Sequence, residues 1–414
     1  MNIYENGYIY ENTYNEYIGK ADKEILLSSL LLLDLSMLYK YFKRETVIPV
    51  FRFFVLHDNE TVDYEISRDV ISANMNITYQ SGQRRSINIE LANQHGKWNF
   101  GASKNLWYGT RFGFDSGVII NNVVYWQKQG VFLLQDFTPA LNSSRHTVSL
   151  TLCDKWGLWD GSVFGNTELK TRIPTQVPMR QCFNTIVHGI NNLGQMWDTK
   201  PIRFNTQHWD TLTYYTIKQE ADQTIGQVLL DMAQTISSDI YYDTLGYMRV
   251  ESNVLDCLSS NFPVVWRFDE DDMDCGSPSV KFGRANYSNK IKVKGAMVNG
   301  YQFTATVTNN NLESIYNAVT NPIKSKTISN TKLYSDMLCK EQAMYEMVKQ
   351  SRGMRSVTLP TAFLPFLDVN QAVYLNFPSL DINNETYIID SISYNIGTDC
   401  SMNISLTSDT EVVL

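Results

Sequence analysis

The chain has 414 residues, of which 43% are hydrophobic, 12% aromatic and 19% charged, and its formal net charge at pH 7 is −8. The hydrophobic fraction excludes a wholly disordered chain, because it provides enough apolar surface to offset the entropy lost on ordering. The acidity argues against a dedicated nucleic-acid binder, which would carry a basic face.

Residues 1–45 are predicted to form a polar arm followed by an apolar helix. The arm is acidic and rich in Tyr and Asn, so it lacks the basic start of a signal peptide. Residues 25–42 contain no Gly or Pro, and their polar side chains follow one helical stripe. This run is interrupted by polar residues and is shorter than the ~20 apolar residues of a bilayer span. We therefore predict a soluble protein with no stable membrane insertion.

The apolar surface of this helix must be covered, either across its own domain or by a neighbouring subunit. The second alternative makes the helix a candidate subunit interface. The residues predicted for it are Leu26, Leu30, Leu33, Met37 and Tyr41.

Residues 46–160 change to a hydrophobic period of two, which is typical of half-buried strands. Gly82 lies in a predicted turn where a positive φ is expected, and Asn121 with Asn122 forms another turn signal. No helix between the strands is long enough for a βαβ unit, so we expect an antiparallel sheet. The predicted strands are 48–56, 73–79, 86–91, 117–126, 130–137 and 146–153.

Residues 161–275 are predicted to form a linker and a small α/β insert domain. The linker contains Pro174 and Pro178. Helices are predicted over 179–193 and 224–237, since apolar residues of the second recur at helical spacing. A hairpin is predicted over 239–250, with its turn at Gly246.

Residues 276–414 return to strand patterns, interrupted by a helix predicted over 336–350. The fold class is therefore mainly β, with an α/β insert and an N-terminal helix. No sequence repeat relates the two β regions. The predicted strands of the second region are 290–295, 301–307, 355–360, 372–376, 387–394 and 401–406.

Catalytic and metal-binding patterns are absent from the sequence. None of the HExxH, GxSxG, P-loop, GxGxxG or EF-hand motifs occurs, and the five histidines are scattered. The six cysteines form no CxxC pair and are too sparse for a disulfide scaffold, which favours reduced thiols. We predict no catalytic residue, no metal site and no cofactor.

Two features leave alternatives open. The acidic run 269–274 has enough carboxylates to hold Ca²⁺ or to act on a glycan, although a solvated linker is the simpler interpretation. The eight tryptophans could form a sugar-binding platform, but such residues are more often core or interface anchors.

Several segments, taken in order, resemble bacteriophage tail and baseplate hub proteins over about residues 46–410. The first region carries Ile71-Ser72, YQSGQRRS at 79–86, IELAN at 89–93, Leu106-Trp107, Gly130-Val131-Phe132 and LTLCDK at 150–155. The later segments are Tyr242-Asp243, Gly246-Tyr247-Met248, NKIKVKG at 289–295, Asn321-Pro322-Ile323, the helix with Ala343, and MNISL at 402–406.

This resemblance implies a structural role without enzymatic activity. Hub proteins contain two tail-tube-like antiparallel β barrels in one chain, and three chains form a ring with six-fold-like symmetry. The ring joins a hexameric tail tube or distal tail protein to a trimeric spike or tip, beside the tape-measure protein. DNA passes through its lumen without specific binding, and the hub, assembled in the host cytoplasm, belongs to the virion. The alternatives are a glycan- or peptidoglycan-acting tail enzyme and a receptor-binding tail protein.

Overall fold

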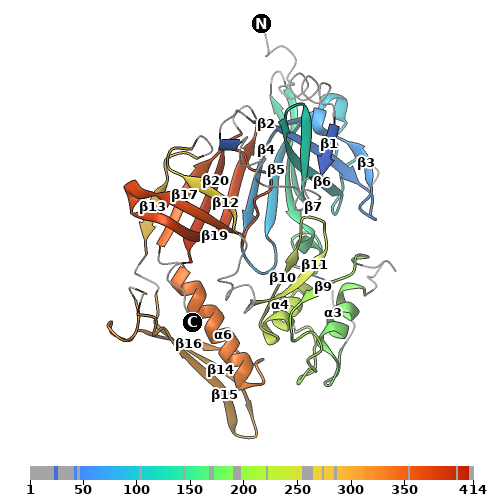
Figure 1. Ribbon diagram of the computed structural model, residues 1–414. Helices are drawn as coiled ribbons and strands as arrows, with labels where there is room; N and C mark the ends of the chain where they lie inside the picture. Colours follow the sequence, from blue (N-terminus) through green and yellow to red (C-terminus); the bar gives the residue numbers. More distant parts are fainter. Residues whose placement is uncertain are drawn as a thin grey trace.

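The computed structural model describes residues 23–26, 42–43, 47–101, 105–142, 145–166, 172–189, 197–220, 222–253, 264–272, 275–283, 287–312, 314, 316–352, 355–397 and 400–409. The chain folds into a large upper sheet with two smaller α/β bodies beneath it (Figure 1). Among the residues described, no helix is long and apolar enough to cross a membrane.

The large sheet contains fourteen of the described strands and draws on both ends of the chain. Its main path runs β13-β17-β20-β19-β4-β5-β8-β7-β6-β2-β3. The N-terminal strands are β1 (Lys23–Leu26), β2 (Ile48–Leu56), β3 (Val62–Glu65), β4 (Val70–Thr78), β5 (Arg85–Ala92), β6 (Arg111–Ile120), β7 (Val123–Asn142) and β8 (Arg145–Asp154). The C-terminal strands are β12 (Val264–Asp269), β13 (Ser279–Phe282), β17 (Arg355–Thr361), β18 (Ala372–Phe377), β19 (Ile382–Ile396) and β20 (Met402–Ser408).

Most alternating patterns form strands as predicted, because every second side chain enters a common core. The predicted strand 117–126 is instead divided between β6 and β7 by the turn at 121–122. The predicted turns are confirmed as well. Gly82 has φ 93°, and Asn121 and Asn122 between β6 and β7 have φ 48° and 61°. Two consecutive left-handed residues match the twist of a tight hairpin, which is why Asn is favoured there.

The N-terminal helix prediction is wrong at its start. Ile25 and Leu26 lie in β1, which runs parallel to β7 from Lys23↔Val123 to Leu26↔Trp126. β7 pairs with β8 only from Phe132 onward, so its first residues offer a free edge. Pairing with that edge satisfies backbone groups and outweighs local helix propensity. Leu30, Leu33, Met37 and Tyr41 lie outside the described residues.

A second body holds a separate core beneath the N-terminal strands. It contains α3 (Met179–Val187), α4 (Ile225–Thr235) and the sheet β10-β11-β9, with β10 (Ser238–Tyr242), β11 (Met248–Ser252) and β9 (Arg203–Asn205). Thr224 and Gln227 form a capping box that starts α4. This body, called the α/β module below, lies within the range 161–275 for which an α/β insert is predicted, and its core includes Phe183, Leu229 and Val250.

A third body is a three-stranded sheet covered by one helix. The sheet runs β15 (Tyr301–Thr308), β14 (Lys290–Val298) and β16 (Ser325–Ser329), and α6 (Asp336–Arg352) packs on one face. The range 276–414 therefore contributes to two sheets, while β12, from the range 161–275, pairs with β18 of the large sheet. The domain boundaries, and the closure of either half into a barrel, remain predictions.

Candidate functional site

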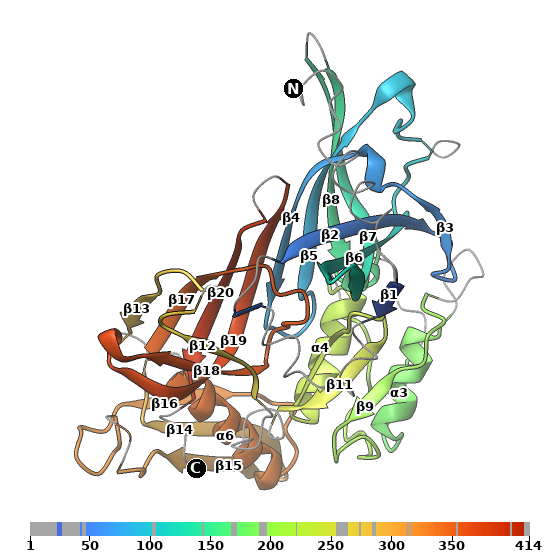
Figure 2. The same ribbon diagram turned by 45° about the horizontal axis from the view of Figure 1, so that its top comes forward.

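We take as the candidate functional site two groups of residues that join different parts of the chain. One joins the N- and C-terminal strands of the large sheet, and the other joins that sheet to the α/β module. The first, here called the seam, is the antiparallel pairing of β4 with β19 from Thr78↔Ser391 to Ala73↔Ile396. Ile77 and Ile392 oppose each other across it, and each is 1% exposed. Both belong to one hydrophobic core that contains residues from each end of the chain. The seam thus joins the N-terminal and C-terminal strands into one continuous layer (Figure 1 and Figure 2).

The exposed side of the sheet around the seam carries small, neutral polar side chains. Asn395, Asn74, Asn88 and Thr151 are register neighbours and form one row across β19, β4, β5 and β8. Asn74 donates to Asn395 at 2.7 Å, and a hollow of about 510 Å³ lies over this row. Asp136 of β7, which is exposed, is the register neighbour of Thr151 and continues the row. We call this face the neutral face, because its members are mostly Asn, Ser and Thr, with Glu90 and Asp136 the charged residues that we assign to it. It comprises Ser72, Asn74, Asn76, Thr78, Ser86, Asn88, Glu90, Asp136, Ser149, Thr151, Ser391, Ser393, Asn395, Asn403, Ser405, Thr358 and Pro360.

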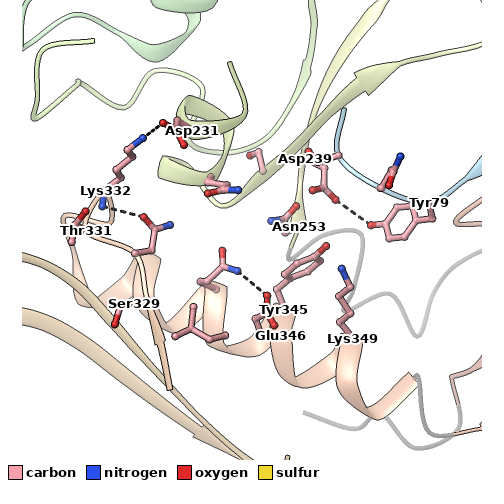
Figure 3. Close-up of a pocket in the computed structure, with 17 residues that line it drawn as sticks. Tyr79, Asp231, Asp239, Asn253, Ser329, Thr331, Lys332, Tyr345, Glu346 and Lys349 are labelled. Atoms are coloured by element: carbon pink, nitrogen blue, oxygen red, sulfur yellow. Dashed lines mark hydrogen bonds and ion pairs between the residues drawn. The ribbon is translucent and has the colours of Figure 1, made fainter. Parts of the chain in front are cut away.

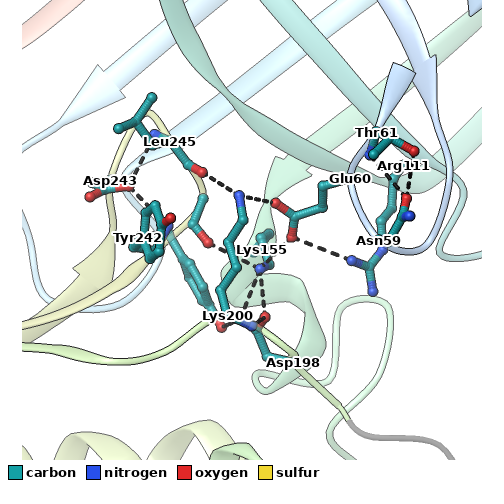
Figure 4. A network of polar contacts seen from close by, with 12 residues as sticks. Asn59, Glu60, Thr61, Arg111, Lys155, Asp198, Lys200, Tyr242, Asp243 and Leu245 are labelled. Atoms are coloured by element: carbon teal, nitrogen blue, oxygen red, sulfur yellow. Dashed lines mark hydrogen bonds and ion pairs between the residues drawn. The ribbon is translucent and has the colours of Figure 1, made fainter. Parts of the chain in front are cut away.

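The second arrangement, here called the clamp, is a buried group of charges between the large sheet and the α/β module (Figure 4). Its members are Glu60, Arg111, Lys155, Asp198 and Lys200. The Lys155 side chain is fully buried, and its Nζ lies 2.5 Å from Glu60 and 2.8 Å from Asp198. Two buried carboxylates therefore compensate one buried ammonium, as burial of charge requires.

The clamp lysines also form hydrogen bonds to the hairpin turn between β10 and β11. Lys155 donates to the Gly246 carbonyl at 3.0 Å, and Lys200 donates to the Leu245 carbonyl at 2.5 Å. A Cβ on Gly246 would lie 2.9 Å from a Glu60 carboxylate oxygen, so glycine permits this close approach. Glu60 itself has φ 65°, an unusual left-handed conformation for this residue, which directs it into the clamp.

Tyr242 extends the clamp into the core of the α/β module. Its hydroxyl donates to Asp198 at 2.8 Å and accepts from the Trp159 indole at 3.0 Å. Burial, with the Asp198 carboxylate nearby, raises the pKa of Tyr242 well above its usual value. The hydroxyl therefore stays protonated and remains a donor.

Arg85 connects three parts of the molecule from a position that is 2% exposed. Its guanidinium donates to the Tyr242 carbonyl of the α/β module at 3.0 Å and to Asp368 of the C-terminal half at 2.5 Å. Its backbone N–H, like that of Arg84, donates to Asp154. Burial raises the pKa of Asp154 to about 6, although these N–H donors oppose the shift.

A polar cavity of about 460 Å³ lies where the β4–β5 turn, the α/β module and α6 meet (Figure 3). Asp231 of α4 forms an ion pair with Lys332, and Tyr79 donates to Asp239 at 3.3 Å. Burial raises the pKa of Asp239 despite the opposing charge of Arg84. The Asp231–Lys332 pair thus links the third body to the α/β module, and the Tyr79–Asp239 bond links that module to the β4–β5 turn.

Two of the described residues of the acidic run, Asp269 and Asp272, form ion pairs. Arg267 donates to Asp269 and, with Asn376, holds the pKa of that carboxyl at about 2. Asp272 lies 2.6 Å from Lys43. In the described part of the chain, no group of three or more His, Cys, Asp or Glu side chains is placed to hold a metal ion.

Most of the tryptophans are core residues, which agrees with the simpler interpretation of the sequence. Trp98, Trp126, Trp156, Trp159 and Trp266 are buried. Trp107 is 45% exposed and lies beside Tyr108, which is 51% exposed, and Phe100. This small aromatic group is the part of the platform hypothesis that survives.

The sequence analysis missed both the seam and the clamp. Asp198 belongs to no motif. Lys155 closes the segment LTLCDK at 150–155, but nothing in that segment distinguishes a buried lysine from an exposed one. The sequence did indicate a turn at Gly246. It gave no indication that the Glu60 carboxylate would lie against this turn.

Comparison with known proteins supports these observations at the level of fold. Residues 313–411 match a family model described as a domain of unknown function, DUF5048. No curated protein matches the sequence.

Solved structures of phage tail proteins are similar along most of the chain. A tail protein from Neisseria meningitidis MC58 is 9% identical with TM-score 0.57, covering 88% of this chain and 98% of its own. The 43 kDa tail protein of prophage MuSo2 from Shewanella oneidensis is 11% identical with TM-score 0.55, covering 87% and 98%. Prophage tail protein gp18 from Listeria monocytogenes EGD-e is 12% identical with TM-score 0.51, covering 87% and 95%. The predicted resemblance is thus confirmed in three dimensions: the chain has the fold of phage tail proteins.

Proposed function

We propose that this chain is a structural, non-enzymatic hub of a phage tail. Three copies form a ring of six-fold-like symmetry at the end of the tail tube, and a spike or tip binds on the other side. Its partners are further copies of the chain, the tail tube or distal tail protein, the tip and the tape-measure protein. The protein belongs to the virion and is assembled in the host cytoplasm.

The seam is the observation that carries this proposal. It places strands of the two chain halves side by side in one sheet with one core. Two similar sheet segments per chain would let three chains match a six-fold partner, since each chain then supplies two positions. The fold shared with phage tail proteins supports the same role.

The neutral face supports an assignment of the channel lining. Asn, Ser and Thr side chains offer DNA neither the cations that would retain a polyanion nor an apolar patch. We assign the neutral face to the lumen of the ring, where DNA passes without specific binding.

The mass of the purified full-length protein and of its complexes tests the ring. A trimer in solution or at the tube end of imaged tails is expected, and a strictly monomeric protein absent from tail particles would contradict it. The channel assignment is tested separately with Asn88→Cys. In the assembled ring this thiol should react with a small maleimide but not with a bulky polymer-linked one.

Residues 1–44 are proposed to contribute to assembly, with Leu26, Leu30, Leu33, Met37 and Tyr41 at a subunit interface. Deleting these 44 residues should impair ring formation while the β circular dichroism signal persists. Unchanged assembly would remove this part of the proposal.

A receptor-binding role is the second candidate, and the exposed aromatic group favours it. Aromatic rings at a surface can stack on sugars. Binding of the full-length protein to a glycan array, abolished by Trp107→Ala, would support this role over the hub.

A further inference from the structure

The outer face of the sheet β15-β14-β16 carries a regular grid of lysines and hydroxyls. Lys290, Lys292 and Lys294 occupy alternate positions of β14 and therefore point to one face. Their register neighbours on β15 are Thr308, Thr306 and Thr304, and those on β16 are Ser325, Thr327 and Ser329. We call these nine residues the lysine grid.

The opposite face of the same sheet shows that this arrangement is not a by-product of packing. Ile291, Val293 and Ile328 face the other way and pack against α6. Lys326 also points to that side, and its ammonium lies 3.3 Å from Glu346 of the helix. The cation on the covered face thus has a carboxylate partner.

The three lysines of the grid have no such partner. Among the described residues, no ion pair or side-chain hydrogen bond involves Lys290, Lys292 or Lys294, and Lys292 is exposed. The grid itself contains no carboxylate. Three neighbouring positive charges without a counter-charge stand out in a chain whose formal charge is −8, and they favour an anionic ligand.

The geometry of the grid suits a polymer of regularly spaced anions. Alternate residues of a strand lie about 6.8 Å apart, so the three ammonium groups form a regularly spaced row that can face successive anions of a polymer. Hydroxyls on both sides of the lysine column, such as Thr306 and Thr327 beside Lys292, can donate to phosphate oxygens. No aromatic side chain belongs to the grid, so bases would not be read.

We propose that the lysine grid binds a phosphodiester polymer through its backbone charges. We take the polymer to be a nucleic acid, because lysines flanked by hydroxyl donors are the side chains that contact its phosphates. A polyol-phosphate, which presents the same repeating anion, is the alternative that the test separates. This inference concerns a face distinct from the seam and does not depend on ring formation. Because the bases are not recognised, this contact agrees with the proposed function, in which DNA is not bound specifically.

Fluorescence anisotropy with the full-length protein tests the proposal. The probes are labelled duplex DNA, single-stranded DNA and poly(glycerol phosphate), with poly-glutamate as a carboxylate polymer. The grid variant is Lys290→Gln/Lys292→Gln/Lys294→Gln. The matched control is Lys128→Gln/Lys281→Gln/Lys340→Gln, whose residues are exposed on β7, β13 and α6.

Both triple variants change the formal charge from −8 to −11, so only the position of the lost charges differs. Three phosphate contacts predict that the wild-type affinity for duplex DNA falls about 40-fold between 50 and 200 mM salt. The grid variant should lose this binding, and the control should keep it together with its salt dependence. DNA should bind at least as tightly as poly(glycerol phosphate). Grid-dependent binding of poly(glycerol phosphate) alone would overturn the assignment to a nucleic acid.

Two outcomes overturn the proposal. In the first, the grid variant and the control bind every phosphodiester probe equally well, or neither the wild type nor the control binds any. In the second, poly-glutamate binds as tightly as the phosphodiesters and with the same dependence on the grid. That result would assign the grid to an acidic protein partner instead.

Discussion

The seam and the clamp join parts of the same molecule by opposite physical means. At the seam, backbone hydrogen bonds and apolar side chains such as Ile77 and Ile392 make one layer of two chain halves. At the clamp, the buried charges of Glu60, Lys155 and Asp198 hold the α/β module against the sheet. The free energy of apolar burial grows with the buried area, so the loss of part of one side chain removes only part of it. A buried charge network is destabilised strongly when one member is lost, because the remaining charge has no partner.

This difference indicates which single substitutions should lower the stability of the fold most. Loss of one seam residue leaves a cavity whose cost depends on its volume. Loss of one clamp residue leaves its partner charged and unsolvated. The following variants measure that contrast.

The largest effect is expected for Lys155→Met. Without the ammonium, Asp198 loses its buried ion-pair partner and Glu60 keeps only Lys200 and Arg111, so the free energy of unfolding should fall by about 3–5 kcal/mol. Urea unfolding measures the loss, and proteolysis should release the α/β module first. Lys218→Met is the control, because that lysine pairs with Glu220 at the surface and should change stability by under about 0.5 kcal/mol. A similar small change for Lys155→Met would contradict the clamp.

Ile392→Ala tests the seam and should cost about 3 kcal/mol, since a buried isoleucine is truncated. Combining it with Ile77→Ala should give a coupling of at least about 0.5 kcal/mol, because the two residues oppose each other. Ser393→Ala, next along β19 but on the neutral face, is the control with little expected effect. Additive losses in the double variant would argue against direct contact across the seam.

Gly82→Val tests the β4–β5 turn, which connects the large sheet to β10 of the α/β module. Gly82 has φ 93°, donates to the Ile240 carbonyl, and would place a Cβ 3.2 Å from the Trp156 ring. We expect a loss of about 2 kcal/mol from backbone strain and crowding. Gly300→Val is a matched control, because Gly300 has φ 81° with no atom near its Cβ position. Equal losses for both variants would show that only the backbone matters.

Counted per pH unit, the smallest effect is a pH dependence at Asp154. Because its pKa is raised to about 6, the folded state keeps a proton between about pH 4 and 6 that the unfolded chain has released. The stability contributed by this group therefore falls as pH rises through that window, by at most about 1.4 kcal/mol per pH unit. Asp154→Asn should remove this slope in urea unfolding series. An unchanged slope would assign the proton to another group.

Local patterns predicted the elements of this fold well. The strands of the large sheet follow a period of two, α4 follows helical spacing with a cap at Thr224, and Gly82 follows turn chemistry. Each of these depends on residues close together in the sequence. The pairing of elements depends on distant residues, and so the seam was not predicted.

The sequence by itself therefore determined most of the longer strands and helices and the resemblance to phage tail proteins, while short strands such as β3, β13 and β16 were not predicted. Only the tertiary structure decided that Ile25 and Leu26 join β7 as a strand, because the free edge lies about a hundred residues away. It also decided that Asn74 meets Asn395, 321 residues further on, and that Lys155 is buried between two carboxylates. Burial and charge compensation are properties of the folded surroundings, and no local pattern of residues encodes them.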